Sequence, residues 1–262
     1  MCCRNKVGRA ELEAKKLVYE TVAVTTIYYN IEAWTNLRTN DMERLECMQG
    51  KVLKGLIGMP KSTPYWALLY ELDIIPIKLV IKYKRLMLYH NIVNSDDKRV
   101  IKGLVKEQER SGYKYCWYGN VKEDGKSIGV EVNEGMVKGK SKDKWKNEVK
   151  SKIRNAFEEE VARRKLESKK MRFLQKKAVD TYLHEVFNQD AVMAMMIRTN
   201  MIGWIDDNYG GNGRCPLCGE VDSTEHVFAC AEIENEGRGS VKNLEEGERM
   251  VEIVELFKCT EQ

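Results

Sequence analysis

Apolar residues recur at three- and four-residue spacing along much of the chain, and this pattern predicts a mainly α-helical protein. Four segments carry the pattern in the first part of the chain, namely residues 10–34, 42–58, 64–72 and 77–93. Threonines and valines at 21–26 leave a β-strand as the alternative for that stretch. Gly58 and Pro60 end the second helix, and Thr63 followed by Pro64 predicts the N-cap and first residue of the third.

The apolar periodicity is lost after residue 94 and returns at Ser141, which can cap a helix. The stretch between them contains several glycines and no clear periodicity, which predicts a linker or an irregular connection. After it, helical patterns cover 169–187 and 189–202. The expected organisation is a helical bundle (1–94), a linker (95–140), a basic helical segment (141–208), a small Cys/His knuckle (209–233) and an acidic tail (234–262).

Charge is distributed unevenly, although the formal net charge is only +4. Residues 138–154 carry eight Lys or Arg side chains against two carboxylates, whereas glutamates dominate 232–261. In the helix that follows Ser141, an apolar seam repeats every four residues at Trp145, Val149, Ile153, Phe157 and Val161. A basic row runs beside that seam at Lys142, Lys146, Lys150 and Arg154. This row indicates a surface that faces a polyanion; a solvated helix face with no partner is the alternative.

Four potential metal ligands lie within sixteen positions near the end of the chain, at Cys215, Cys218, His226 and Cys230. Two cysteines separated by two residues can place both thiolates on one ion, and Gly219 directly after them relieves the tight turn. His226 and Cys230 are four residues apart and share one face of a short helix. Four such ligands with no open position predict structural zinc. Cys2, Cys3, Cys47, Cys116 and Cys259 lack a comparable arrangement and are expected to be ordinary thiols.

Several function classes are not supported by the sequence. The first residues contain no apolar signal segment, and the most apolar early stretch is too polar for a membrane span, so we expect an intracellular protein that does not enter a membrane. His90 and His184 lie near no nucleophile motif and are expected to be packed or surface side chains. Asp206 and Asp207 resemble a polymerase metal-binding turn, but a glycine-rich loop follows them where such a turn needs a strand.

Several motifs occur in the order found in one known family. They are YNIEAWT at 29–35, MERLECMQGKVLKGLIGMP at 42–60, STP at 62–64, LLYELDIIPI at 68–77, SKDKWKNEVKSKI at 141–153 and CPLCGEVDSTEHVFAC at 215–230. Together they resemble the region after the polymerase core in reverse transcriptases of non-LTR retrotransposons, especially elements with a C-terminal zinc knuckle. The resemblance spans about residues 12–230. It implies that residues 1–94 are thumb-like.

The resemblance also bears on activity. Reverse transcriptases of this family carry fingers and palm with the catalytic aspartates before the matching region, and some carry an endonuclease with a Pro-Asp motif after the knuckle. Neither module is recognisable in this sequence, where no proline precedes an aspartate. We therefore expect a non-catalytic fragment, located in the nucleus, that binds duplex DNA, an RNA–DNA hybrid or element RNA. A zinc-stabilised helical module that binds a protein partner is the alternative.

Overall fold

The computed structural model describes residues 12–168, 171, 174, 188–199, 201, 213–214, 218–221, 226 and 230. In these residues the regular elements are helices, together with an isolated antiparallel bridge between Arg214 and Val221. The prediction of a mainly α-helical protein is therefore confirmed. Packing divides the chain into two compact units, which we describe separately: unit 1 comprises 1–24, 50–74 and 162–262, and unit 2 comprises 25–49 and 75–161.

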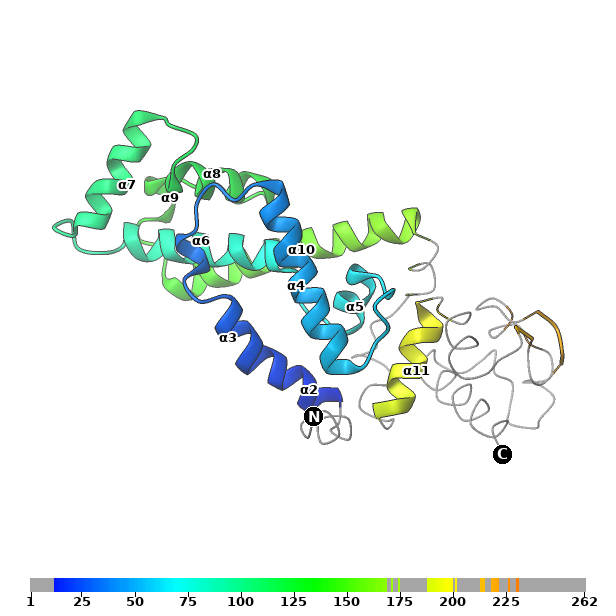
Figure 1. Cartoon of the computed structure of the whole chain (residues 1–262). Helices are drawn as coiled ribbons and strands as arrows, with labels where there is room; N and C mark the ends of the chain where they lie inside the picture. Colours follow the sequence, from blue (N-terminus) through cyan, green and yellow to red (C-terminus); the bar gives the residue numbers. More distant parts are fainter. Residues whose placement is uncertain are drawn as a thin grey trace. The chain divides into compact units, whose positions relative to one another are not determined.

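The helices are labelled in Figure 1. Their bounds are α2 (Leu12–Val18), the π-helix η1 (Tyr19–Ala23), α3 (Val24–Ile27), the 3-10 helix η2 (Ile31–Ala33), α4 (Thr39–Ile57), α5 (Tyr65–Glu71), α6 (Ile77–Val93), α7 (Val100–Ser111), α8 (Trp117–Ser127), α9 (Glu134–Val137), α10 (Lys142–Glu167) and α11 (Asn188–Arg198). The chain passes from one unit to the other within α3, within α4, between α5 and α6, and within α10.

The segment at 21–26 is helical, so the strand alternative is wrong. Thr21 adapts to the helix because its hydroxyl donates to the Leu17 carbonyl at 2.7 Å, one turn back. The apolar residues of this segment divide between core and surface. Tyr19 and Tyr28 are buried, whereas Leu17 and Val22 are exposed. Apolar spacing therefore predicted the helix but not which of its residues enter a core.

Helix α4 contains a buried glutamine whose burial the pattern of apolar residues does not predict. Gln49 is fully buried, and its Oε1 accepts a hydrogen bond from the Ile77 N–H at 2.8 Å. Its Nε2 donates to the Tyr28 hydroxyl at 3.0 Å and to the Ile75 carbonyl at 3.2 Å. Ile77 is the first residue of α6, so its N–H has no partner inside that helix. Gln49, which belongs to the same unit as α6, thus provides the hydrogen-bond acceptor that the first N–H of this helix lacks.

Two predicted helix starts have different outcomes. Ser141 precedes α10 and its hydroxyl accepts from the Lys144 N–H at 3.3 Å, as an N-cap does. The prediction for α5 is wrong by one residue, since Pro64 is the N-cap and Tyr65 begins the helix. Thr63 is buried, and its hydroxyl has no hydrogen-bond partner in the part of the chain that the structure describes. Helix α5 begins without a side-chain cap. The φ of Pro64 is fixed by its ring, and its carbonyl accepts a hydrogen bond from the Leu68 N–H.

The prediction of an irregular linker at 95–140 is wrong, because this stretch contains α7, α8 and α9 and belongs to unit 2. Packing against α6 fixes it (Figure 1). Its glycines predict breaks in a helix, but Gly125 lies inside α8, where a Cβ atom would collide with the Val132 side chain and lie 2.7 Å from the Val130 carbonyl oxygen. Glycine therefore permits a close approach between α8 and the chain that follows it.

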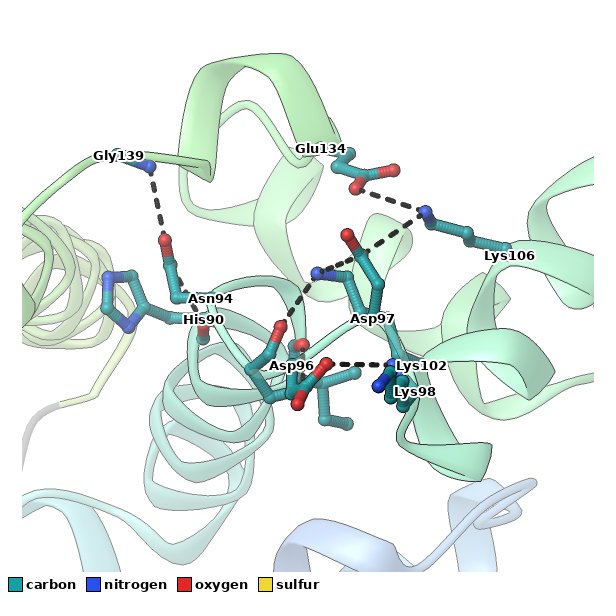
Figure 2. Close-up of polar contacts among 11 residues, drawn as sticks. His90, Asn94, Asp96, Asp97, Lys98, Lys102, Lys106, Glu134 and Gly139 are labelled. Atoms are coloured by element: carbon teal, nitrogen blue, oxygen red, sulfur yellow. Dashed lines mark hydrogen bonds and ion pairs between the residues drawn. The ribbon is translucent and has the colours of Figure 1, made fainter.

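Polar side chains connect the end of α6 to α7 and to the loop around α9 (Figure 2). Asn94 accepts a hydrogen bond from the Gly139 N–H at 3.1 Å. Lys102 is buried on α7, and its ammonium donates to the Ser95 carbonyl at 2.9 Å and pairs with Asp97 at 2.8 Å. This hydrogen bond from Lys102 lowers the pKa of Asp97. These contacts give the buried Lys102 ammonium its hydrogen-bond and ion-pair partners. The segment can therefore fold although it contains few apolar residues.

Substitution of Gly125 tests this close packing. We expect Gly125→Ala to reduce the free energy of unfolding by about 1–3 kcal/mol, because the new methyl group must displace backbone at Val130. Gly103→Ala is the matched control, since a Cβ there meets nothing within 4 Å and α7 is helical at that position. The control should raise stability by about 0.5–1 kcal/mol. Urea denaturation of both variants measures the difference, and equal effects would contradict this role of Gly125.

In unit 1, α5 is held by charged side chains as well as by its apolar residues. Arg198 of α11 and Glu71 of α5 are both fully buried and pair at 2.9 Å. Arg164 lies over the Trp66 ring at 4.5 Å, and Lys165 lies over the Tyr70 ring at 3.9 Å. The helix predicted at 189–202 is confirmed as α11. Of the helix predicted at 169–187 the structure describes only Met171 and Leu174, both buried, and Asp206, Asp207 and the tail at 234–262 lie outside the described residues.

Candidate functional site

The apolar seam of α10 is buried as predicted. Its residues, Trp145, Val149, Ile153, Phe157 and Val161, have exposed fractions between 0% and 5%. Trp145 fixes the first turns to α6, because its indole N–H donates to the Leu86 carbonyl at 3.1 Å. His90 of α6 stacks on the same indole at 6.0 Å. A helix anchored along one face presents its other side chains from a rigid support.

The basic row lies at the edge of this buried seam. Lys142 and Lys150 are exposed, and Lys146 and Arg154 are half-buried. In the described part of the chain no carboxylate comes within 4.0 Å of the ammonium groups of Lys142, Lys146 or Lys150. Lys140, just before the helix, is paired, since its ammonium lies 2.8 Å from the Glu148 carboxylate. The three lysines of the row are therefore available to an anionic partner.

His90 is a packed side chain, as the sequence indicated. It is buried, and its Nε2 lies 2.9 Å from the Lys140 carbonyl. A carbonyl can only accept, so Nε2 carries the proton. The Lys140 ammonium in turn lies 5.2 Å from the centre of the Trp145 ring. His90 thus holds the chain in place directly before the basic row.

Three of the four predicted metal ligands come together in the structure. The ligand atoms of Cys218, His226 and Cys230 all lie within 4.8 Å of one another. The two sulfur atoms are 3.8 Å apart, and the Cys218 sulfur lies 3.1 Å from His226 Nε2. Tetrahedral zinc with bonds of about 2.3 Å to sulfur places two sulfurs about 3.8 Å apart. The group can therefore hold a metal ion, and the chemistry of its donors suits zinc. Cys215 lies outside the described residues.

The turn before these ligands has the geometry that its glycine predicts. Gly219 has a φ of +75°, a left-handed conformation that other residues rarely adopt. The Arg214 side chain donates to the Gly219 carbonyl at 3.0 Å, and Arg214 forms the antiparallel bridge with Val221. These contacts hold Arg214 beside Gly219 and Val221, next to the Cys218 ligand.

Cys116 has a structural role that spacing alone did not show. Its thiol accepts from the Gly119 N–H at 3.3 Å and donates to the Tyr113 carbonyl at 2.8 Å, which makes it the N-cap of α8. Cysteine is not among the residues that usually cap helices, so this role could not be predicted from the residue type. Cys47 is exposed.

Comparison of the chain with protein-family models, curated proteins and solved structures finds no match. Among the helices that the structure describes, none combines the length and the apolar character that crossing a bilayer requires.

Proposed function

We propose that this chain binds nucleic acid without catalysing a reaction, as a fragment similar to the thumb and zinc-knuckle region of a non-LTR reverse transcriptase. The basic row Lys142, Lys146, Lys150 and Arg154 contacts backbone phosphates of duplex DNA or an RNA–DNA hybrid. Such contacts position a protein on nucleic acid but specify no sequence. A nuclear location is part of the same proposal.

One observation carries this proposal. Three lysines of the row have no partner carboxylate among the described residues, while the seam beside the row is buried and hydrogen-bonded to α6. A solvated helix of high charge usually alternates the two signs, so that its cations pair along the helix. Arg163 and Glu167 form such a pair near the end of α10, at 2.6 Å. Lys142, Lys146 and Lys150 in the first half of α10 form no such pair with a described carboxylate, which favours an external anion.

We propose that zinc, held by Cys215, Cys218, His226 and Cys230, stabilises the region after α11. The ion would supply bonds that replace a hydrophobic core over a stretch rich in glycine and charge. Four protein ligands leave no position for a reacting water, so this zinc is structural. A knuckle built in this way can also contact target DNA or element RNA.

Salt dependence of binding tests the function. Each phosphate contact to duplex DNA adds about 0.9 to the slope of log affinity against log salt. We expect binding with little sequence preference, and we expect the Lys142→Gln, Lys146→Gln, Lys150→Gln triple variant to lower the slope by about three units. The helix content of the variant should be unchanged, because these side chains lie outside the buried seam. Fluorescence anisotropy over a salt series measures the slope.

A protein-interaction module is the second candidate, and one surface favours it. Val100, Ile101 and Leu104 of α7 are exposed by 78%, 48% and 55%. Exposed apolar groups on one helix face often mark a protein contact. If the triple variant binds nucleic acid with the same slope as the parent chain, the basic row is only solvated and this second candidate becomes the better one.

A further inference from the structure

A second group of cations lies in unit 2, around the C-terminal end of α8. Lys78 and Lys82 are one turn apart on α6, and the Lys82 ammonium donates to the Ser127 hydroxyl at 2.6 Å. Lys126 is in the last turn of α8. From α10, the Lys152 ammonium reaches Gly129, where it lies 3.8 Å from the position of a Cβ atom. Helices α6 and α10 thus each send a lysine to residues 127–129, at the end of α8.

The described carboxylates near these lysines form no ion pair with them. Asp124 is paired with Arg85 at 2.9 Å. Glu123 is exposed and lies more than 4.0 Å from any described ammonium. Glu148 precedes Lys152 by one turn of α10 but is paired with Lys140 at 2.8 Å. Lys78, Lys126 and Lys152 make no ion pair within the residues that the structure describes.

Lys82 is the central member, since it is half-buried and its hydrogen-bond partner is a neutral hydroxyl. Burial lowers the pKa of Lys82. The positive charges of Lys78 and Arg85 lower this pKa further, whereas the negative charges of Asp124 and Glu123 raise it. The Ser127 hydroxyl donates its own proton to the Asp124 carbonyl at 2.7 Å, so it is fixed as an acceptor. Two N–H groups of the ammonium remain for another partner.

We propose that Lys82 and Lys152, with Ser127 orienting Lys82, form a phosphate-binding site at the C-terminal end of α8 that takes a backbone phosphate of a nucleic acid. This inference rests on the proposed function for the source of the phosphate. An oxyanion at this point pairs with two ammonium groups that form no ion pair with a described carboxylate. It also offsets the repulsion between Lys82 and Lys78.

The site lies on the side of α10 away from the basic row. Relative to the seam residue Val149, a helix step of about 100° per residue places Lys150 on one flank. Lys152, one position before Ile153, falls on the other flank by the same step. Lys144 lies on this second flank too, one residue before Trp145. The helix therefore carries phosphate contacts on both flanks, and the row found from four-residue spacing is only one of them.

A phosphate titration tests the site independently of nucleic acid. Tripolyphosphate is added to the full chain, and the lysine Cε and Hε signals are followed by NMR. We expect the signals of Lys82 and Lys152 to shift with saturation and the pKa of Lys82 to rise when tripolyphosphate is bound, because the anion favours the charged ammonium. Lys114 is the internal control, since it lies before the other end of α8, about 16 Å away along the helix. Equal weak shifts of all lysines would overturn the site.

Duplex DNA then tests the physiological ligand. Lys82→Gln should lower the salt slope by about 0.9, and Lys82→Gln with Lys152→Gln by about 1.8. Lys82→Arg should retain the parent slope because it keeps the charge, and Lys114→Gln should change it little. Circular dichroism of each variant monitors folding. If Lys82→Gln disturbs the fold, the salt slope of Lys152→Gln alone tests the site. Lys152 is exposed, so its replacement should leave the packing intact.

The outcomes separate this inference from the proposed function. If the basic-row triple variant lowers the slope while the Lys82 and Lys152 variants do not, the function stands and the second site is wrong. If the Lys82 and Lys152 variants lower the slope and the triple variant does not, the second site stands and the basic row is wrong. A parent chain that binds no duplex at low salt would overturn both assignments to nucleic acid.

Discussion

Protein purified without chelator is expected to contain about one zinc ion per chain, and Cys218→Ser with His226→Ala is expected to reduce this content to near zero. Two thiolates and an imidazole already lie within 4.8 Å of one another, and Cys215 follows the spacing of a fourth ligand. Structural zinc sites in small finger peptides have apparent binding free energies of about 10–16 kcal/mol at neutral pH, and most of this is folding free energy. Loss of the metal should therefore unfold the residues around the site.

Elemental analysis and limited proteolysis measure the two consequences. The matched control is Cys47→Ser, which removes an exposed thiol that belongs to no cluster of three or more potential ligands among the described residues. Acid should also release the metal, because cysteine ligands must be deprotonated and protons compete for them as the pH falls. An unchanged metal content in the double variant would show that these residues are not the ligands.

Trp145→Ala is expected to reduce the free energy of unfolding by about 3–5 kcal/mol, the usual cost of truncating a large buried aromatic side chain. Trp145 is fully buried, stacks on His90 and donates to the Leu86 carbonyl. Its removal leaves a cavity at the contact between α10 and α6. The lysines that follow it then lose their rigid support, so nucleic-acid binding should weaken as well.

Trp145→Phe separates packing from the indole hydrogen bond. The Leu86 carbonyl lies inside α6 and keeps its partner in the helix, so loss of the indole N–H should cost only about 0.5–1.5 kcal/mol. Denaturant unfolding monitored by circular dichroism gives both values. A Trp145→Ala variant as stable as the parent would contradict the role of this residue as the anchor of α10.

The seam of α10 was predictable because it depends only on the spacing of apolar residues along one helix. Five apolar residues at four-residue spacing on a highly charged helix can only be buried on one side, and all five are. The metal ligands were predictable for a similar reason, since short spacing within the chain brings Cys218, His226 and Cys230 together with little help from the rest of the fold. Local sequence is sufficient where the interacting groups are close in sequence.

The stretch at 95–140 was not predictable in the same way. Its helices are polar, and their glycines suggested breaks in a helix. Gly125 is instead required by the approach of Val130 and Val132, and the buried Lys102 is satisfied by Ser95 and Asp97. Both contacts depend on how the chain turns back on itself, which the spacing of apolar residues does not encode.

The amino-acid pattern was sufficient to predict the helical class of this protein, the buried seam of α10 with the basic row beside it, and a cluster of potential metal ligands. Each follows from periodicity or short spacing, where geometry is set by the helix or the turn alone. The packed structure was needed to show that Gln49 provides a hydrogen-bond acceptor for the first N–H of α6, that Lys82 bonds Ser127, and that Lys152 approaches Gly129. These groups are far apart in sequence, so their hydrogen bonds and charges interact only after packing has brought them together.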